Sequence, residues 1–372
     1  MAKLSFIISI FFVLLSAKYL TNKDCNECHE GIYNEYQTSY HSKTYFNDEL
    51  HRKVANSVNK DVYDCAACHM PAASNLKDII TGKAKPDKNN KTHKDGVSCF
   101  YCHQIAFVKK AHQKNEIMLA RQAEGYKPTL YGSLENPEDS DKHTMTHSPI
   151  YRKYACTGCH SHKRNAHDVM IFDAMGGEED STECIKCHMP EVDGKVEDMN
   201  KKSRKTHHSH KFMGIHSALM RKKGVDINVT TSANSIEVVL KNKMPHPLII
   251  QPARMKYLKI TIKRDDKKVW QNFQNSPTED KQGSFYIDFI DKGGKVVNIP
   301  AFGYKKGYEN NLKPKEIKKL TYKTPKLQKG DKVIVELYVV LAKDSCAKAI
   351  DLKDLNSTRP LLMKKCNFIV LK

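Results

Sequence analysis

The chain has 372 residues, which is enough for two domains of ordinary size. Its formal net charge is +20, so it should attract anionic proteins, small anions or an anionic membrane surface. The lysines are spread along the whole chain and no nucleic-acid-binding motif occurs, so we expect no binding to nucleic acid.

The first 17 residues have the pattern of a secretory signal peptide. Lys3 precedes an apolar run from Leu4 to Leu15, and the small pair Ser16-Ala17 follows. A membrane-spanning helix needs roughly 20 apolar residues, which is more than this run supplies, and no second run of that length follows. We predict export to the periplasm with cleavage after Ala17; an uncleaved N-terminal anchor is the alternative.

Ten of the 12 cysteines fall into five copies of one pattern, in which Cys-x-x-Cys is followed at once by histidine. The copies, numbered here as motifs 1 to 5, are CNECH (25–29), CAACH (65–69), CFYCH (99–103), CTGCH (156–160) and CIKCH (184–188). A zinc site or a thioredoxin-like redox pair places no demand on the residue after the second cysteine.

Covalent attachment of c-type haem does require this histidine. The two thiols add to the haem vinyl groups, and the imidazole becomes the proximal ligand of the iron. We therefore predict five haem c groups. The attachment cysteines are Cys25, Cys28, Cys65, Cys68, Cys99, Cys102, Cys156, Cys159, Cys184 and Cys187, and the proximal ligands are His29, His69, His103, His160 and His188.

Histidines outside the motifs are numerous and lie close to them. Five of the 18 histidines are proximal, which leaves 13, and twelve of these precede residue 217. Electron carriers close the second axial position of a haem with histidine or methionine, whereas enzymes leave it for substrate. The segment 204–220 holds His207, His208, His210 and His216, and we interpret it as a source of distal ligands. A surface cluster that binds nickel or zinc is the alternative, and it suits His207 and His208 better.

The sequence around the motifs resembles the periplasmic multihaem cytochromes related to hydroxylamine oxidoreductase and its tetrahaem electron-acceptor cytochrome. The resemblance spans residues 25 to about 220 and is carried by CNECHEGIYNEYQTSYHSKTY, HKDGVSCFYCHQI, YGSLENPEDSDKHTMTHSPIYRKYACTGCH and HKFMGIH. It implies distal ligands at His41, His93, His143 and His210. His216 is the expected fifth ligand, and His147 and His246 compete for this place. The chain departs from the family at Tyr36, where tryptophan is more usual.

From about residue 222 the composition changes to alternating apolar and polar runs with breaks rich in Gly, Asn, Asp and Pro. These runs predict an antiparallel β-sandwich of immunoglobulin-like type. The fold class is thus multidomain: a signal peptide (1–17), a mainly helical and irregular pentahaem cytochrome c domain (18–221), and an all-β domain (222–372). Within the haem domain, 115–126 is the segment that we most expect to be helical.

Two features of the β domain point to further roles. The segment around His246 resembles the stretch that opens the β domain in related cytochromes, but proline replaces the glycine before the histidine, so a loop histidine at the domain interface is the alternative to an iron ligand. Cys346 and Cys366 lie outside any haem motif, and an oxidising compartment favours a disulfide between them, with free thiols as the alternative.

Three functions fit these observations. The first is a periplasmic cytochrome that carries electrons between a respiratory donor and a terminal reductase, with an acidic cytochrome or a membrane quinol dehydrogenase as partner. The second is a multihaem oxidoreductase that acts on a small nitrogen or sulfur oxyanion at one open haem. In the third, the β domain is a docking module and the haems serve the complex that it joins, for which a membrane-associated complex is one candidate. The excess of histidines, and the absence of the Cys-x-x-Cys-Lys variant, favour electron transfer.

Overall fold

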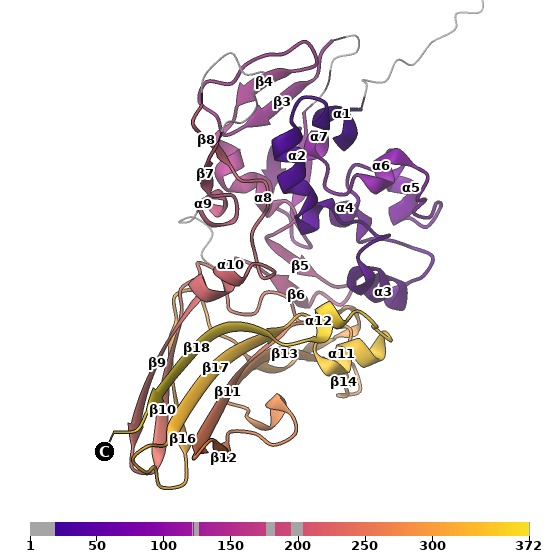
Figure 1. Ribbon diagram of the computed structural model, residues 1–372. Helices are drawn as coiled ribbons and strands as arrows, with labels where there is room; N and C mark the ends of the chain where they lie inside the picture. Colours follow the sequence, from indigo (N-terminus) through magenta and orange to yellow (C-terminus); the bar gives the residue numbers. More distant parts are fainter. Residues whose placement is uncertain (1–18, 121, 123–125, 176–182, 195–203, 372) are drawn as a thin grey trace, which may run out of the picture.

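The computed structural model describes residues 19–120, 122, 126–175, 183–194 and 204–371. The predicted signal peptide lies outside the described residues. No helix in these ranges is both long and apolar enough to cross a membrane. The chain forms an N-terminal part of short helices and two-stranded ribbons, and a C-terminal part made largely of long strands (Figure 1).

The N-terminal part contains short elements joined by irregular chain. Its helices are α1 (Asn22–Asn26), α2 (Glu30–Gln37), η1 (Tyr40–Ser42), α3 (Glu49–Val58), α4 (Ala66–His69), α5 (Leu76–Ile80), α6 (Lys91–Lys94), α7 (Cys99–Cys102), η2 (Pro149–Arg152), α8 (Tyr154–Thr157), α9 (Cys184–His188) and α10 (Ala218–Lys223). Its strands are β1 (Ile105–Lys109), β2 (Glu116–Leu119), β3 (Thr129–Gly132), β4 (Thr144–His147), β5 (His162–Arg164), β6 (Met170–Asp173), β7 (Glu191–Asp193) and β8 (Thr206–His208).

Each CxxCH motif forms about one helical turn. In the first four motifs the histidine N–H donates to the carbonyl of the first cysteine at 2.9 Å, and the fifth motif is the whole of α9. Positions i, i+3 and i+4 of a helix lie on one face. The turn therefore presents both thiols and the imidazole to the same side, which is the arrangement that haem attachment needs.

The described residues of the segment 115–126 do not form the predicted helix. Its residues Glu116–Leu119 form β2, which pairs antiparallel with β1, and Asn115 donates through Nδ2 to the carbonyl of Thr157 at 3.0 Å. A Cβ atom on Gly158 would lie 2.3 Å from Ile117, so this strand packs closely on the turn of motif 4. Packing against the motif overrides the local helix propensity.

The C-terminal part consists of two antiparallel sheets and a few short helices. Its strands are β9 (Val225–Ser232), β10 (Ser235–Asn242), β11 (Met255–Arg264), β12 (Lys267–Gln271), β13 (Ser284–Ile290), β14 (Val296–Val297), β15 (Lys305–Asn310), β16 (Ile317–Lys323), β17 (Lys332–Val340) and β18 (Leu361–Ile369). Its helices are η3 (Pro277–Glu279), η4 (Pro300–Phe302), α11 (Asp344–Ala349) and α12 (Leu355–Thr358).

The two sheets share one hydrophobic core. One sheet has the strand order β16-β10-β9, and the other has β14-β13-β11-β17-β18, with β12 beside β11 and β15 beside β13. Every second side chain points inward, as Ile236, Val238 and Leu240 do on β10, and these meet Leu258 of β11 and Leu337 of β17. The sequence pattern predicted these strands, and the immunoglobulin-like topology stays a prediction.

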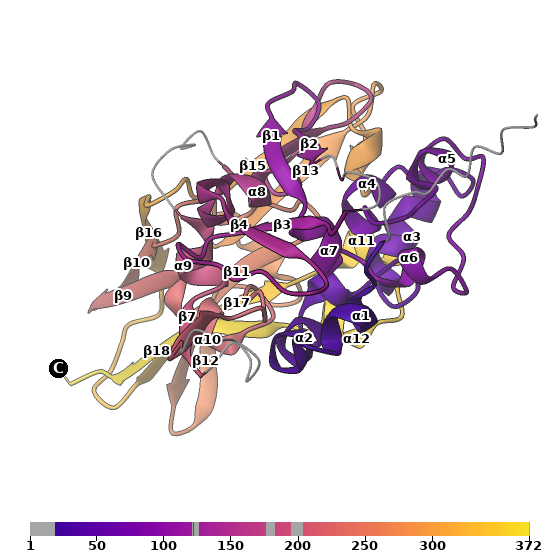
Figure 2. The ribbon, with the colours of Figure 1, turned by 90° about the horizontal axis from the view of Figure 1, so that it is seen from above.

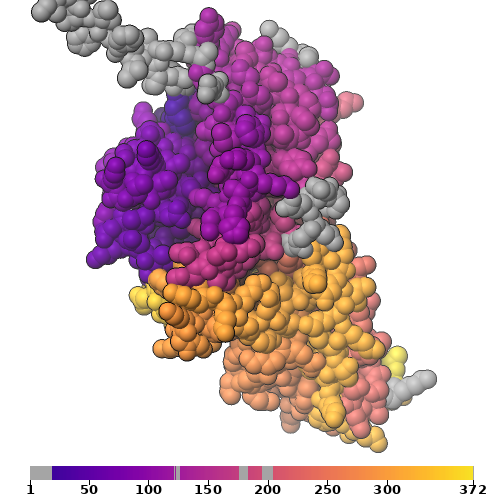
Figure 3. Space-filling model, turned by 180° about the vertical axis from the view of Figure 1, so that it is seen from behind, coloured from indigo at the N-terminus to yellow at the C-terminus, as the bar shows by residue number. Residues whose placement is uncertain are grey.

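The two parts pack against each other along a continuous seam (Figure 3). Helix α3 lies beside α11 and α12 (Figures 1 and 2), where Leu50 and Val54 pack against Ile299, Cys346 and Ile350. The side-chain amide of Asn165 donates to the carbonyls of Pro300 at 3.0 Å and Gly303 at 2.7 Å. The β-rich part is therefore a scaffold for one side of the helical part.

Cys346 and Cys366 do not form the predicted disulfide, because both thiols are free. Cys346 is buried in α11, which follows the end of β17. Cys366 lies within β18 opposite Val335, five residues before that end. Five residues of strand extend about 16 Å, whereas bridged cysteines have Cα atoms less than about 7 Å apart.

Candidate haem-binding cavity

A cavity of about 2090 Å³ runs through the N-terminal part and along its border with the β-rich part. The cysteines and histidines of all five motifs line it. A pocket for a single ligand measures roughly 300–1,000 Å³, so this cavity has the size to take several large groups.

Thiols of different motifs lie close to one another inside the cavity. Cys25 and Cys99, Cys68 and Cys159, and Cys156 and Cys184 are near enough for each pair to interact electrostatically. The thiol of Cys102 also interacts electrostatically with those of Cys156 and Cys159. Motif 1 thus adjoins motif 3, motif 3 adjoins motif 4, and motif 4 adjoins both motif 2 and motif 5.

Three proximal histidines face a second histidine at nearly the same separation. The ring centres are 6.2 Å apart for His29 and His143, 6.3 Å for His103 and His210, and 5.9 Å for His160 and His41. With metal–nitrogen bonds of about 2.0 Å, two imidazoles on opposite sides of one iron have ring centres roughly 6 Å apart. These pairs fit a six-coordinate haem iron.

A fourth pair joins His69 to His51, which was not among the distal ligands expected from the sequence. Their ring centres are 4.6 Å apart, so an iron between them requires the rings to separate by roughly 1.5 Å. His51 lies in the first turn of α3. Both rings line the cavity.

Several of the motif and non-motif histidines donate the N–H of Nδ1 to a backbone carbonyl. The Nδ1 atom of His103 lies 2.6 Å from the carbonyl oxygen of Tyr131, and that of His188 lies 2.6 Å from the carbonyl oxygen of Met213. The Nδ1 atom of His210 lies 2.8 Å from the carbonyl oxygen of His208. Such a bond fixes the tautomer and leaves Nε2 unprotonated for a metal. The segment 208–213 therefore orients a proximal and a distal candidate together.

The backbone of His41 is held from two directions. The hydroxyl of Tyr36 contacts its carbonyl at 3.2 Å, and the N–H of Val97 donates to the same carbonyl at 3.1 Å. Gly96 has φ +62°, and a Cβ there would lie 2.7 Å from this oxygen. The residue at 96 must therefore be glycine for the chain before motif 3 to approach His41.

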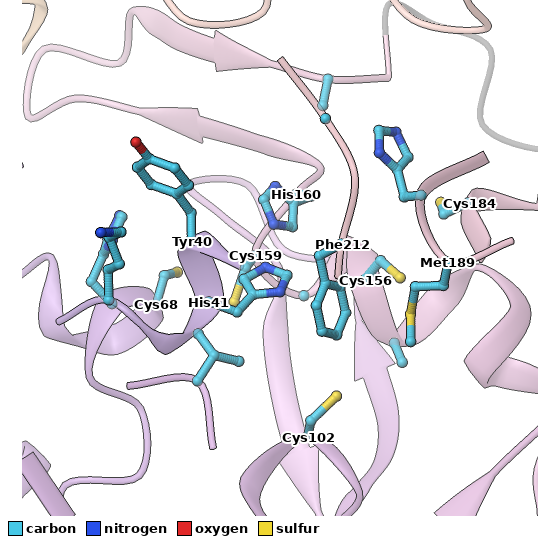
Figure 4. A pocket seen from close by; sticks show the side chains of 18 of the residues that line it. Tyr40, His41, Cys68, Cys102, Cys156, Cys159, His160, Cys184, Met189 and Phe212 are labelled. Carbon is cyan, nitrogen blue, oxygen red and sulfur yellow. The ribbon is translucent and has the colours of Figure 1, made fainter. Parts of the chain in front are cut away.

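Phe212 separates two distal candidates. Its ring meets that of His41 edge to face, with ring centres 4.3 Å apart, and also that of His210 at 5.9 Å. Figure 4 shows His41 between His160 and Phe212, with cysteines of motifs 2 to 5 around them.

Burial keeps these imidazoles neutral. Burial, together with the charges of nearby histidines, lowers the pKa of His41, His69 and His210 to about 3. The pKa of His160 falls to about 4 for the same reasons, and those of His29, His103 and His143 are also lowered. Neutral imidazole is the form that binds a metal, so no proton must be removed near pH 7.

The resemblance implied that His93 is a distal ligand, but in the structure it does not face a proximal histidine. Its Nδ1 accepts from the N–H of Asp87 at 3.0 Å, and its Nε2 lies 2.7 Å from Oδ1 of Asn75, to which it donates. One nitrogen therefore uses its lone pair and the other holds the proton. His93 is buried outside the described lining of the cavity, where it joins two loops.

The three candidates for the fifth distal place lie in different surroundings. His216 lines the cavity and stacks on Tyr40 with ring centres 3.5 Å apart. His147 is not among the described lining residues of the cavity, and its Nδ1 lies 3.0 Å from the carbonyl oxygen of Leu134. His246 lines the cavity, and its Nδ1 lies 3.0 Å from the carbonyl oxygen of Pro247. It also interacts electrostatically with His188.

Two cations of the β-rich part line the same cavity and were not expected from the sequence. Burial lowers the pKa of Arg254 to about 10 and that of Lys256 to about 7. Arg254 acts electrostatically on Tyr40, His216 and His246. A buried cation needs an anionic partner, and haem propionates have that charge.

The segment 204–220, with its four histidines, was also considered as a nickel or zinc site. Among the described residues, no group of three or more His, Cys, Asp or Glu side chains is arranged to bind a metal ion. His207 has Nε2 3.4 Å from Oε2 of Glu35, and Nδ1 of His208 lies 2.9 Å from the carbonyl of Met189.

Comparisons with known proteins agree with this geometry. Residues 24–104 match the family described as cytochrome c554 and c-prime. The fold is similar to that of a penta-haem cytochrome c552 from Thermochromatium tepidum, with a TM-score of 0.74 and 24% identity over 94% of this chain and 99% of that one. A match to a beta-glucuronidase from Bacteroides uniformis covers 40% of this chain and 13% of the beta-glucuronidase chain, at 13% identity. Its TM-score of 0.15 is too low to indicate a shared fold.

No curated protein matches the chain. The family match includes motifs 1 to 3, and the structural match extends over both the helical and the β-rich part. Together with the five motifs, these similarities support a c-type cytochrome with several haems.

Proposed function

We propose that the protein is a periplasmic pentahaem cytochrome that carries electrons between a respiratory donor and a terminal reductase. The observation that carries this proposal is the facing of proximal and non-motif histidines across the cavity. Bound haem supplies a one-electron iron couple, and two axial histidines leave no coordination place for a substrate.

We assign the distal iron ligands from the pairs of facing histidines described above. We assign His143 to the haem of motif 1, His51 to motif 2, His210 to motif 3 and His41 to motif 4. For motif 5 we propose His246, because it lines the cavity and interacts with His188, whereas His216 is stacked on Tyr40. His51 and His246 thus take the places that the sequence gave to His93 and His216.

The electrostatic interactions between thiols of different motifs suggest how the haems are ordered. Motif 4 adjoins motifs 2, 3 and 5, and motif 1 adjoins motif 3. Haems attached to adjoining motifs lie close together, so we expect a branched array centred on motif 4 rather than a linear one.

Electron paramagnetic resonance of the oxidised protein tests the function. We expect five low-spin ferric haems, because each iron has two histidine ligands. A high-spin signal that accounts for one haem in five would contradict the assignment and would favour the second candidate.

The second candidate is an oxidoreductase with an open haem at motif 5. Arg254, and Lys256 when it is protonated, favour it, since both line the cavity and their charge could attract a nitrogen or sulfur oxyanion. His246 decides between the two: if it binds the iron of motif 5, the cations serve the propionates, and His246→Ala converts one low-spin haem to high-spin.

A further inference from the structure

Helix α3 carries a histidine whose surroundings differ from those of the other ligand candidates. The second nitrogens of His103, His188, His210 and His246 face backbone carbonyls. In His51 the partner is a carboxylate: Nδ1 lies 2.7 Å from Oδ2 of Asp48.

Asp48 holds His51 through both of its oxygens. It is the N-cap of α3, and its Oδ1 accepts from the backbone N–H of His51 at 3.1 Å while Oδ2 accepts from the ring. The side chain of Asp48 is 14% exposed and that of His51 33% exposed, so water screens this bond only in part.

The helix that carries this pair is fixed on both sides. Ala55 packs in the core around motif 2, whereas Leu50 and Val54 pack against the β-rich part. The backbone N–H of Lys353 in the β-rich part donates to the carboxylate of Glu49 at 3.3 Å, so a hydrogen bond adds to this packing. The position of Asp48 and His51 relative to His69 is thus set by both parts of the chain.

We propose that Asp48 is a positioning residue that lowers the reduction potential of the haem of motif 2. A carboxylate that accepts the Nδ1 proton draws it away from the ring and makes the other nitrogen a stronger electron donor. A stronger donor stabilises ferric over ferrous iron. The haem of motif 2 then gives up its electron more readily than it would with the carbonyl partners found elsewhere in the cavity.

This inference rests on the proposed assignment of His51 as a distal ligand. The test is a redox titration, followed by visible and electron paramagnetic resonance spectroscopy, of the full-length protein with all haems attached. Asp48→Asn removes the charge but keeps a side chain that caps helices equally well, so α3 should remain folded. Mass spectrometry verifies that haem attachment is unchanged.

We expect Asp48→Asn to raise one of the five midpoint potentials and to leave all haems low-spin. A tenfold change in the balance between ferric and ferrous forms corresponds to about 59 mV for one electron. The g values of one low-spin signal should change with it, because they report the donor strength of the ligand.

Glu49→Gln is the matched control. It removes the same charge one residue away on the same helix, but Glu49 forms an ion pair with Lys53 at 3.2 Å rather than a bond to His51. If both variants shift one potential equally, the effect is one of charge alone and the proposal is wrong. If Asp48→Asn shifts none, it is also wrong.

His51→Ala separates this proposal from the ligand assignment on which it rests. A new high-spin haem in this variant, together with a silent Asp48→Asn, overturns the role of Asp48 and leaves the assignment standing. If His51→Ala keeps every haem low-spin, His51 is not a ligand and the assignment itself fails.

Discussion

His210 shows how a single residue can be placed from a local pattern. No Cys-x-x-Cys pair stands directly before His210 in its segment, HKFMGIH, so the sequence excludes a proximal role for it. The structure sets its ring 6.3 Å from that of His103, more than 100 residues earlier in the chain. The carbonyl of His208 orients the ring, and Phe212 packs against it.

We expect His210→Ala to convert one haem to high-spin while all five stay covalently attached. The reason is that the iron of motif 3 loses its sixth ligand but keeps both thioether bonds. Electron paramagnetic resonance and mass spectrometry measure the two quantities. His112→Ala is the control, because His112 is exposed and pairs with Asp168 at 2.6 Å. No new high-spin signal in His210→Ala would argue for another ligand.

For His93 we expect no effect on the haem iron, although the family resemblance implied that His93 and His210 are both distal ligands. We expect His93→Ala to leave every haem low-spin and to destabilise the fold by about 1–3 kcal/mol, because the N–H of Asp87 and the side chain of Asn75 lose a buried partner. Thermal unfolding and electron paramagnetic resonance distinguish the outcomes. A high-spin haem in this variant would restore His93 as a ligand.

At the scale of elements, the strands are better determined by the sequence than the helices. Period-two alternation in the C-terminal part predicts β10 and β17, since each needs one apolar face for the shared core. The helical turns of the N-terminal part have few apolar residues, and the attached groups supply their core. Periodicity therefore says little there, and the strand β2 was missed.

Leu337 tests how far the shared core stabilises the β-rich part. It is fully buried on β17 opposite Leu258 of β11. Leu337→Ala should lower the free energy of unfolding by about 2–5 kcal/mol, because it removes apolar contacts and leaves a cavity. Denaturant unfolding followed by far-ultraviolet circular dichroism measures the change. Ile317→Ala on β16 is the control, since Ile317 is 59% exposed, and a similar loss in both variants would contradict this core.

At the scale of the whole molecule, the number of haems is the first quantity to measure. Denaturing mass spectrometry of the mature protein should give the mass of the chain plus five haems, because each of the five motifs has two thiols and a histidine facing one cavity. A mature chain with four or fewer would refute the assignment.

The charge of the molecule leads to a further expectation about its partner. With 62 lysines and arginines against 42 acidic residues, the chain should be steered toward an acidic redox protein. Its rate of reduction by an acidic cytochrome should therefore fall as ionic strength rises, and stopped-flow mixing at 0.01 and 0.15 M salt measures this. An equal rate at both salt concentrations would argue against electrostatic docking, because the screening length shortens from about 30 to about 8 Å.

The sequence by itself determined the attachment of the haems, since CxxCH is a local pattern whose chemistry is complete within five residues. It also determined the alternation of the β-rich part. Only the tertiary structure decided which distant histidines face the motifs. Whether a histidine ligates iron depends on where its two nitrogens point, and these directions are set by contacts far along the chain. His51 faces His69, whereas His93 uses both nitrogens in hydrogen bonds to neighbouring loops.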